Sequence, residues 1–447
     1  MSFKLKKSDQ IEENPFLGDF GPDSEIIQKC IHCGFCTTTC PTFSLLGNEM
    51  DSPRGRIYLI KMVKDGEISV NDTVIKHLDR CLDCRACETA CPSGVEYSSL
   101  IESAREGLEK VRHRSLVSKL FRRFLFRWLL PNRPLLQFFC ILTWIYQNSF
   151  LRNLVARLSL LPKKIREIEP MMPEVPKISS MISQPVETEE NRITTYKIAF
   201  FSGCIQSVLF NDVNLAATRV LEANGVHVVF PKSQTCCGAL QAHAGDRETA
   251  RVLAQENVGA FDNLQEFDAI VLAVSGCGAM LRDYGNLLSH DKTICEEAFS
   301  FGEKVMDVMD FLSKIPLKKV RLPNEQNITY HHACHLYHSL KVRTQPIDVL
   351  NSIENLKMSI LPESDWCCGS AGSYNLTHTD LSMRLLDRKM ENISSTGAEI
   401  VCTGNPGCQI QIDYGSRKDG LGLRVVHPII LLDEAYRFSG IYDSNFK

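Results

Sequence analysis

The sequence lacks several features that mark common classes of protein. Its 50 Lys and Arg residues are matched by 53 Asp and Glu residues, so the net charge is −3 and the strong positive field of a general nucleic-acid-binding protein is missing. No G-x-G-x-x-G fingerprint is present, which argues against a dinucleotide site of the Rossmann type. The chain starts with a charged and polar segment and no apolar run, so we expect a cytoplasmic protein in a reducing compartment.

Cysteine, in contrast, is abundant. The 447 residues include 19 cysteines. Because the chain is too long for a small secreted disulfide scaffold, these cysteines indicate metal-binding thiolates. Residues 1–109 carry eight of them in two runs of the pattern C-x2-C-x2-C-x3-C-P. The runs are Cys30, Cys33, Cys36 and Cys40 before Pro41, and Cys81, Cys84, Cys87 and Cys91 before Pro92.

This spacing is typical of a protein with two [4Fe–4S] clusters. Three thiolates two residues apart hold one side of a cluster, and in two-cluster ferredoxins the fourth thiolate comes from the other run. We therefore predict crossed ligation. Cluster 1 takes Cys30, Cys33, Cys36 and Cys91, and cluster 2 takes Cys81, Cys84, Cys87 and Cys40. Zinc sites usually use two C-x2-C pairs and disulfides do not fit a reducing compartment, so both alternatives are weaker.

Two of the arginines between the runs lie in the segment MDSPRGR. Arg54 and Arg56 follow Ser52-Pro53, which is a typical helix start. They either donate hydrogen bonds to a cluster or to a partner's carboxylates, or they are solvated side chains on that helix.

The C-terminal part of the chain contains a duplication. A single cysteine, a Cys-Cys-Gly triplet and a final cysteine occur twice, and corresponding positions are offset by 130 or 131 residues. The first copy has Cys204, Cys236, Cys237 and Cys277, and the second has Cys334, Cys367, Cys368 and Cys408. We predict a first repeat unit at 195–320 and a second at 321–447.

Each repeat unit alternates short apolar runs with helical stretches, which favours a parallel α/β sheet. The expected strands lie at 196–201, 226–230, 268–274, 328–332 and 399–403. The cysteines then occupy loops after strands, where open α/β sheets bind ligands. The predicted fold is therefore mixed α+β and α/β, with an α-helical two-[4Fe–4S] ferredoxin-like domain at 1–109 followed by two duplicated α/β domains.

Residues 110–194 join these parts. From Lys110 to Arg166 there are 13 Lys or Arg and no Asp or Glu, and the uncharged stretch Pro134–Leu151 is at the lower length limit for crossing a bilayer. Two readings stay open: docking on an anionic membrane surface through aromatic side chains and charges that include Arg122, Arg123 and Arg127, or packing against protein. The Pro-rich stretch Glu169–Asn191 predicts an extended linker.

The motifs resemble known redox proteins. The repeat resembles the cysteine-rich CCG domain of heterodisulfide-reductase-like and related redox subunits. A ferredoxin-like module followed by two CCG domains resembles the iron–sulfur subunits of bacterial glycolate oxidases. Segments that carry this resemblance are MDSPRGRIYLIK, FSGCIQ, TCCGA, SGCGAMLRDYG and CCGSAGSYNLTH.

The resemblance implies an electron-transfer subunit of an oxidoreductase that acts on CH–OH groups. Glycolate would be oxidised to glyoxylate on a partner flavoprotein that holds the FAD, and this chain would pass electrons towards quinone from the inner face of the cytoplasmic membrane. No catalytic residue is predicted here. Alternatives are a subunit of another flavin-linked dehydrogenase, for anaerobic glycerol 3-phosphate or lactate oxidation, or a heterodisulfide-reductase-like thiol redox protein.

The repeat departs from the fullest CCG pattern, which has five cysteines. The position of the missing cysteine is Val274 in the first unit and Asn405 in the second. The four cysteines of each unit are therefore candidates for a further cluster or metal site, or for a thiol redox pair without metal. The histidines around Cys334 are interpreted as packing and hydrogen-bonding residues: His331, His332, His335 and His338.

Overall fold

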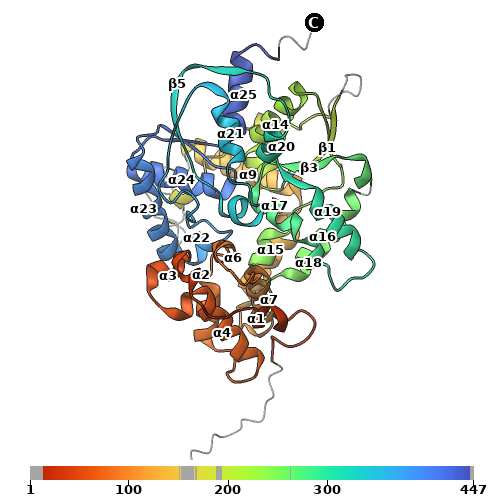
Figure 1. The fold of residues 1–447 in the computed structure, drawn as a ribbon, viewed down its shortest axis with the longest axis vertical. Helices are drawn as coiled ribbons and strands as arrows, with labels where there is room; N and C mark the ends of the chain where they lie inside the picture. The colour runs from red at the N-terminus through yellow and green to blue at the C-terminus, as the bar shows by residue number, and fades with distance from the viewer. Residues whose placement is uncertain are drawn as a thin grey trace, which may run out of the picture.

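The computed structural model describes residues 14–150, 152, 166, 169–187, 194–261 and 263–442. Figure 1 shows a small helical region at one end of the molecule and two α/β units side by side above it. This arrangement is the predicted one, with a helical N-terminal region and two parallel sheets. Cys84 of the second run and all eight cysteines of the repeat units border a cavity where these three parts meet.

The N-terminal region consists of short helices around a small apolar core. Its elements are α1 (Ser24–Gln28), α2 (Phe35–Thr38), α3 (Pro41–Leu46), η1 (Glu49–Asp51), α4 (Pro53–Lys64), α5 (Asp72–Asp79), α6 (Ala86–Thr89) and α7 (Tyr97–Val111). Ile60, Leu78, Leu100 and Ile101 are fully buried between α4, α5 and α7. The short helices α2 and α6 lie within the two cysteine runs and contact each other.

The two cysteine runs share one backbone conformation. His32 and Gly34 in the first run, and Asp83 and Arg85 in the second, all have positive φ. Gly34 and Arg85 are the N-caps of α2 and α6. This left-handed conformation between the cysteines turns successive thiols towards one side, and it is uncommon for the non-glycine residues.

The two repeat units have the same sheet topology. The first sheet has the order β2-β1-β3-β4 and the second has β6-β5-β7-β8, with all strands parallel. The first strands are β1 (Tyr196–Phe200), β2 (Val226–Val229), β3 (Ala269–Leu272) and β4 (Val305–Asp307). The second set is β5 (Val320–Tyr330), β6 (Ile353–Ser359), β7 (Ile400–Cys402) and β8 (Arg424–Val426). The predicted strands are therefore present, and the shared order supports a duplication.

Helices cover both sheets. The first unit has α13 (Gln206–Leu209), α14 (Asn211–Ala223), α15 (Ala239–His243), α16 (Arg247–Ala260), η4 (Leu264–Glu266), α17 (Ser275–Arg282), α18 (Tyr284–Leu287), α19 (Cys295–Lys304) and α20 (Val308–Ser313). The second has the π-helical η5 (His335–Ser339), α21 (Gln345–Asn351), α22 (Tyr374–Thr377), α23 (Thr379–Ser395), α24 (Pro406–Asp419) and α25 (Pro428–Phe438). Helices α14 and α25 pack in one apolar core that both units share, and Arg219 pairs with Asp433 across it at 2.8 Å.

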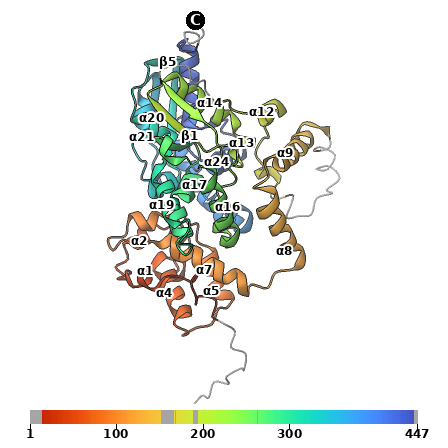
Figure 2. The ribbon, with the colours of Figure 1, turned by 90° about the vertical axis from the view of Figure 1, so that its right-hand side faces the viewer.

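The segment after α7 forms an arm along one side of the molecule (Figure 2). It contains α8 (Leu116–Arg123), the π-helical η2 (Phe124–Leu129), α9 (Arg133–Asn148), η3 (Glu169–Met171) and α12 (Ile178–Ile182). Where extended chain was expected after Glu169, η3 and α12 form because Met171 and Met181 are buried against the body. Among the described residues, no helix is both long and apolar enough to cross a membrane.

Candidate metal centres

The first cysteine run borders a small cavity near the surface. Its walls include the four predicted ligands of cluster 1, Cys30, Cys33, Cys36 and Cys91, together with Cys87. Cys33 is exposed, and the neighbouring side chains of Ile31, Phe35 and Tyr58 are more than half exposed. A cluster held here would lie close to solvent.

The second run borders a deeper cavity. Its walls include the four predicted ligands of cluster 2, Cys40, Cys81, Cys84 and Cys87. Three of these, Cys40, Cys81 and Cys87, are buried. The crossed ligation remains a prediction, and the division of the cysteines between two cavities supports it.

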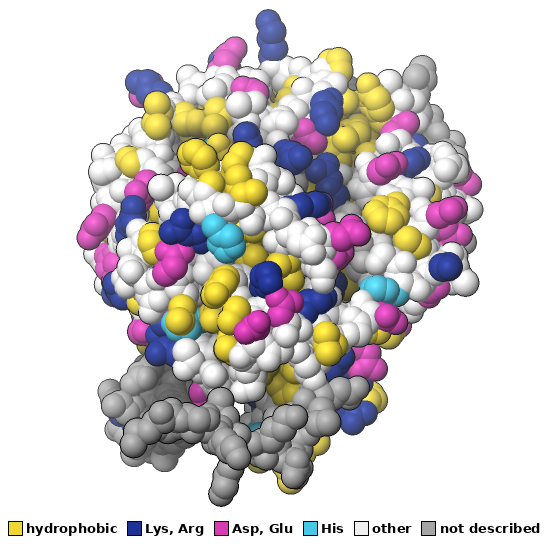
Figure 3. Space-filling model, turned by 60° about the horizontal axis from the view of Figure 1, so that its bottom comes forward, with side chains coloured by type: hydrophobic (Ala, Val, Ile, Leu, Met, Phe, Trp, Pro, Cys, Tyr) yellow, Lys and Arg dark blue, Asp and Glu magenta, His cyan; other side chains and the backbone are white. Residues whose placement is uncertain are grey.

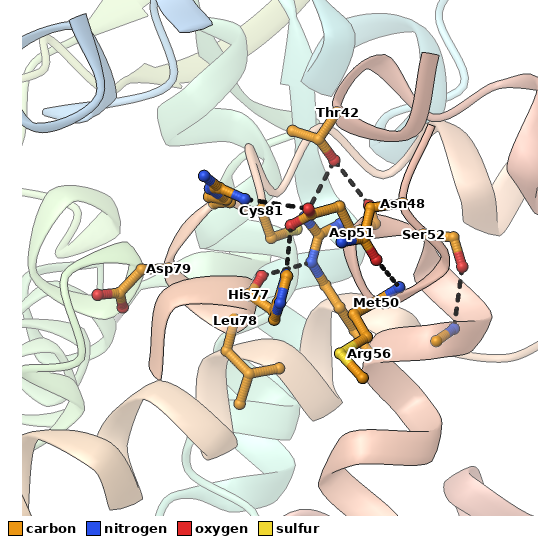
Figure 4. Close-up of polar contacts among 12 residues, drawn as sticks. Thr42, Asn48, Met50, Asp51, Ser52, Arg56, His77, Leu78, Asp79 and Cys81 are labelled. Atoms are coloured by element: carbon orange, nitrogen blue, oxygen red, sulfur yellow. Dashed lines mark hydrogen bonds and ion pairs between the residues drawn. The ribbon is translucent and has the colours of Figure 1, made fainter. Parts of the chain in front are cut away.

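A buried arginine approaches the second cavity. Arg56 is 1% exposed and its Nη1 lies 4.0 Å from Cys40 Sγ. Its other donors bond to Thr42 Oγ1 at 3.0 Å and to the carbonyl oxygen of His77 at 2.7 Å (Figure 4). Arg54 instead is bound to Glu49 at 2.6 Å near the surface. Arg56 is therefore placed at the second cavity, whereas Arg54 lies on the wall of the first cavity and also donates to His32 O at 3.2 Å.

Arg56 belongs to a network around a buried carboxylate that sequence reasoning missed. Asp51 is fully buried, and its oxygens lie 2.9 Å from His77 Nδ1, 3.1 Å from Arg80 Nη1 and 3.6 Å from Arg56 Nη2 (Figure 4). These groups hold η1, α4 and α5 together next to the second cysteine run. The only signal in the sequence was the polar MDSPRGR segment, which does not reveal its distant partners.

All eight cysteines of the repeat units border one central cavity of about 240 Å³. They do not form two separate cavities. The carboxyl ends of both parallel sheets face each other here, as Ser275 N donates to Gly404 O at 3.1 Å between the two units. Cys84 of the second run also lies on the wall of this cavity, as do His243 and His335.

The thiols pair in the same way in both units. In the first unit, Cys204 Sγ lies 3.4 Å from Cys236 Sγ, and Cys237 Sγ lies 3.1 Å from Cys277 Sγ. In the second unit, the corresponding thiols interact as Cys334 with Cys367 and Cys368 with Cys408. A disulfide would need about 2.05 Å, and all 19 cysteines are free. Each repeat unit therefore contains a set of four free thiols that lie close together.

One thiol of each set is favoured as a thiolate. The pKa of Cys236 lies well below its usual value because the thiols of Cys204 and Cys237 donate hydrogen bonds to it. The pKa of Cys368 is lowered in the same way by Cys367 and Cys408. Burial and the neighbouring thiols raise the pKa of Cys204, Cys237, Cys367 and Cys408, so metal binding would release protons from these thiols. Four converging sulfur donors are the ligand type that a thiophilic metal or an iron–sulfur cluster takes.

A buried ionic group joins the N-terminal region to the first repeat unit. His243 Nδ1 lies 3.1 Å from Asp83 Oδ2 and 3.1 Å from Glu102 Oε1. Burial lowers the pKa of His243, but the carboxylates of Asp83 and Glu102, which accept from the protonated ring, outweigh it and raise this pKa to about 9. His335 Nε2 contacts the Asp83 carbonyl oxygen at 2.9 Å. The loop between Cys81 and Cys84 is thereby bound to both repeat units, which no spacing in the sequence indicated.

These features define an iron–sulfur protein with a dicluster module and two cysteine-rich units. Family models agree: a 4Fe-4S dicluster domain matches residues 26–95, and a cysteine-rich domain matches 198–282 and 328–413. The linker region of glycolate oxidase iron-sulfur subunits matches residues 117–172.

Similar proteins extend this to the whole chain. A probable glycolate oxidase iron-sulfur subunit of Bacillus subtilis is 37% identical over 92% of this chain and 95% of the relative. The glycolate oxidase iron-sulfur subunit of Escherichia coli is 36% identical over 88% of this chain and 91% of the relative. The chain belongs to the family of glycolate oxidase iron-sulfur subunits. Lactate utilization protein A of Bacillus pumilus is 30% identical, but over only 52% of this chain.

Proposed function

We propose that this chain is the electron-transfer subunit of a glycolate oxidase complex. In this proposal a partner flavoprotein oxidises glycolate to glyoxylate, and the clusters of this chain carry the electrons onward to quinone. The observation that carries the proposal is the continuous series of cysteine sites from the surface to the interior. The names of the two relatives that match nearly the full chain supply the substrate.

The series consists of three neighbouring sites. The first cavity is near the surface, and Cys87 lies on its wall and on the wall of the second cavity. Cys84 lies on the walls of the second cavity and of the central cavity. Clusters in the first and second cavities and a metal in the central cavity would therefore be neighbours. Such a series divides the two electrons of a reduced flavin into single-electron steps.

The residues fit the groups that this function needs. Eight thiols in two crossed sets suit two [4Fe–4S] clusters. The two four-thiol sets of the repeat units suit a further cluster or metal. The FAD belongs to the partner in this proposal.

The exposed surface beside the first cavity suits contact with the flavoprotein. Ile31, Phe35 and Tyr58 provide apolar contact area next to Cys33. Figure 3 shows this end of the molecule with hydrophobic, acidic and basic side chains interspersed. Exposed apolar side chains surrounded by charged ones suit a protein–protein contact with an apolar centre and a polar rim.

The arm suits an anionic membrane surface. Leu116, Val117, Leu120 and Phe121 of α8 are each more than 60% exposed, and Trp128 of η2 is 63% exposed. Apolar side chains next to basic ones on one helix favour the interface of a membrane with anionic lipids. In this proposal the complex lies on the cytoplasmic face of the membrane, where quinone is available.

Co-purification tests the proposal. The full chain is purified anaerobically from its own organism with an affinity tag, and the bound flavoprotein is identified by mass spectrometry and FAD content. We expect glycolate to reduce the iron–sulfur clusters of the isolated complex. A flavoprotein that reduces them with lactate or glycerol 3-phosphate and not with glycolate would reassign the subunit to that dehydrogenase.

A further inference from the structure

The two repeat units share a backbone but differ around their cysteines. His331 of the second unit and Phe201 of the first follow the central strands β5 and β1. Their backbone N–H groups donate to Cys402 O and Val271 O, each at 2.9 Å. These two residues are equivalent by the 130-residue offset of Cys334 and Cys204. The same place in the fold thus holds an imidazole in one unit and a phenyl ring in the other.

His331 lacks the partners that a buried histidine normally has. Its side chain is fully buried, and neither ring nitrogen makes a hydrogen bond of ordinary geometry. One ring nitrogen and the thiols of Cys368 and Cys408 all lie within 4.8 Å of one another. Buried polar groups are normally hydrogen-bonded, so a ring nitrogen that faces two thiols without such a bond is available as a metal ligand. Phe201, in contrast, is an ordinary core residue stacked on Phe261.

Two further positions differ between the units, with a polar or charged residue in the second unit and a valine in the first. Asn405 replaces the missing fifth cysteine of the second unit and donates from Nδ2 to Cys408 Sγ at 3.7 Å, whereas Val274 is the corresponding residue in the first unit. Lys389 is 1% exposed in α23 and bonds to the Glu363 carbonyl oxygen, and its charge acts on Cys368, Cys334 and Cys367. The equivalent residue of the first unit, by the 131-residue offset, is Val258.

We propose that the two repeat units hold inequivalent metal centres, and that His331 is an additional ligand of the second centre beside Cys334, Cys367, Cys368 and Cys408. The first centre has thiolate ligands and an apolar surround. The inference rests on metal binding by the repeat cysteines, which is part of the proposed function. It assigns His331 the role of a ligand instead of the packing role expected from the sequence.

The electronic consequence follows from charge. Hydrogen bonds to the sulfurs of an iron–sulfur centre and positive charge near it raise its reduction potential. Asn405 and Lys389 act in this direction, and only on the second unit. Electrons that reach the central cavity would therefore collect on the second centre.

Pulsed EPR with isotope labelling tests the ligand. The full chain is prepared anaerobically with ¹⁵N-histidine, and the signals of the central centres are searched for nitrogen hyperfine coupling. We expect a strong coupling that is lost in His331→Phe, which introduces the residue of the first unit.

His332→Phe is the matched control. The ring nitrogens of His332 already contact Ser364 Oγ at 3.1 Å and Arg343 O at 3.0 Å, so this variant should keep the coupling. If metal analysis finds zinc instead of iron, the histidine scattering in zinc-edge X-ray absorption replaces the EPR signal.

The possible results distinguish a failure of the His331 assignment from a failure of the proposed metal binding by the repeat units. Metal beyond the about eight irons of two [4Fe–4S] clusters, with no strong histidine coupling, would overturn the ligand assignment alone. The same holds for a coupling that survives in His331→Phe. No metal beyond those about eight irons would instead overturn metal binding by the repeat units.

Discussion

Arg56 Nη1 lies 4.0 Å from Cys40 Sγ, inside the protein and beside the cavity that the second cysteine run forms. The same guanidinium lies 3.6 Å from the buried carboxylate of Asp51. One buried cation thus balances a carboxylate on one side and faces a predicted cluster thiolate on the other. This places both a structural and an electronic function on Arg56.

Replacing Arg56 by Met should affect stability and potential together. Removal of one partner of a buried ion pair costs about 3–5 kcal/mol, although His77 and Arg80 still pair with Asp51 and reduce that cost. Loss of the positive charge should also lower the midpoint potential of cluster 2. Denaturant unfolding and EPR-monitored redox titration measure the two effects. Arg54→Met, at the exposed Glu49 pair, should change neither by much. An unchanged potential in Arg56→Met would show that Arg56 is purely structural.

Single cysteine changes should interrupt the electron series at defined points. Cys36→Ser at the outer site and Cys84→Ser at the inner one should abolish glycolate-dependent quinone reduction by the complex. Dye reduction by the flavin subunit should persist, because it does not need this chain. Cys295→Ser is the control, since Cys295 lies outside every predicted ligand set. Quinone reduction that survives in Cys36→Ser or Cys84→Ser would contradict the relay.

The arm offers a test of membrane binding. Of the three arginines predicted to meet the membrane, Arg122 donates to Ala244 O at 2.8 Å and Arg127 pairs with Glu248 at 3.2 Å. Lys119 and Arg123 are exposed. Lys119→Gln with Arg123→Gln should weaken binding to vesicles that contain anionic lipid by about thirtyfold, at roughly 1 kcal/mol for each charge.

Vesicle sedimentation at low salt measures this effect, and Arg127→Gln should have a smaller one. Sedimentation that is the same for wild type and the double variant would show that the arm binds protein instead of lipid.

The buried His243 should make stability depend on pH. Its pKa in the folded protein, about 9, is above its usual value of 6.5, so protonated His243 contributes stability that is fully present below about pH 6.5. The contribution is lost as pH rises towards and through 9, and amounts to on the order of 3 kcal/mol. The Tm difference between wild type and His243→Gln should therefore shrink between pH 6.5 and pH 10. A difference that stays constant over this range would mean that His243 is neutral in the folded protein.

The sequence alone predicted those parts of the molecule that depend on short cysteine spacings and on the internal repeat. The spacing of Cys30, Cys33 and Cys36 and its second occurrence predicted the dicluster module, and the offset between the CCG triplets predicted two equal parallel sheets. These predictions need only local backbone geometry and the internal repeat, because each motif is itself a folding unit.

The arrangement between motifs could not be predicted in this way. That all eight repeat cysteines border one cavity depends on how two sheets meet, and no spacing within either unit encodes it. Similarly, Arg54 and Arg56 look alike in the sequence, and only the packing of α4 buries the second. His331 was one of four clustered histidines, and its fully buried, unpaired ring distinguishes it only in three dimensions.

The central claim is that the eight N-terminal cysteines hold two [4Fe–4S] clusters. Quantitative iron and acid-labile sulfide analysis of a variant in which the eight repeat cysteines are replaced by serine, prepared anaerobically, tests it most directly. The account predicts about eight irons and about eight sulfides per chain, with a low-temperature EPR signal after reduction. A colourless protein that contains zinc and no inorganic sulfide would contradict it.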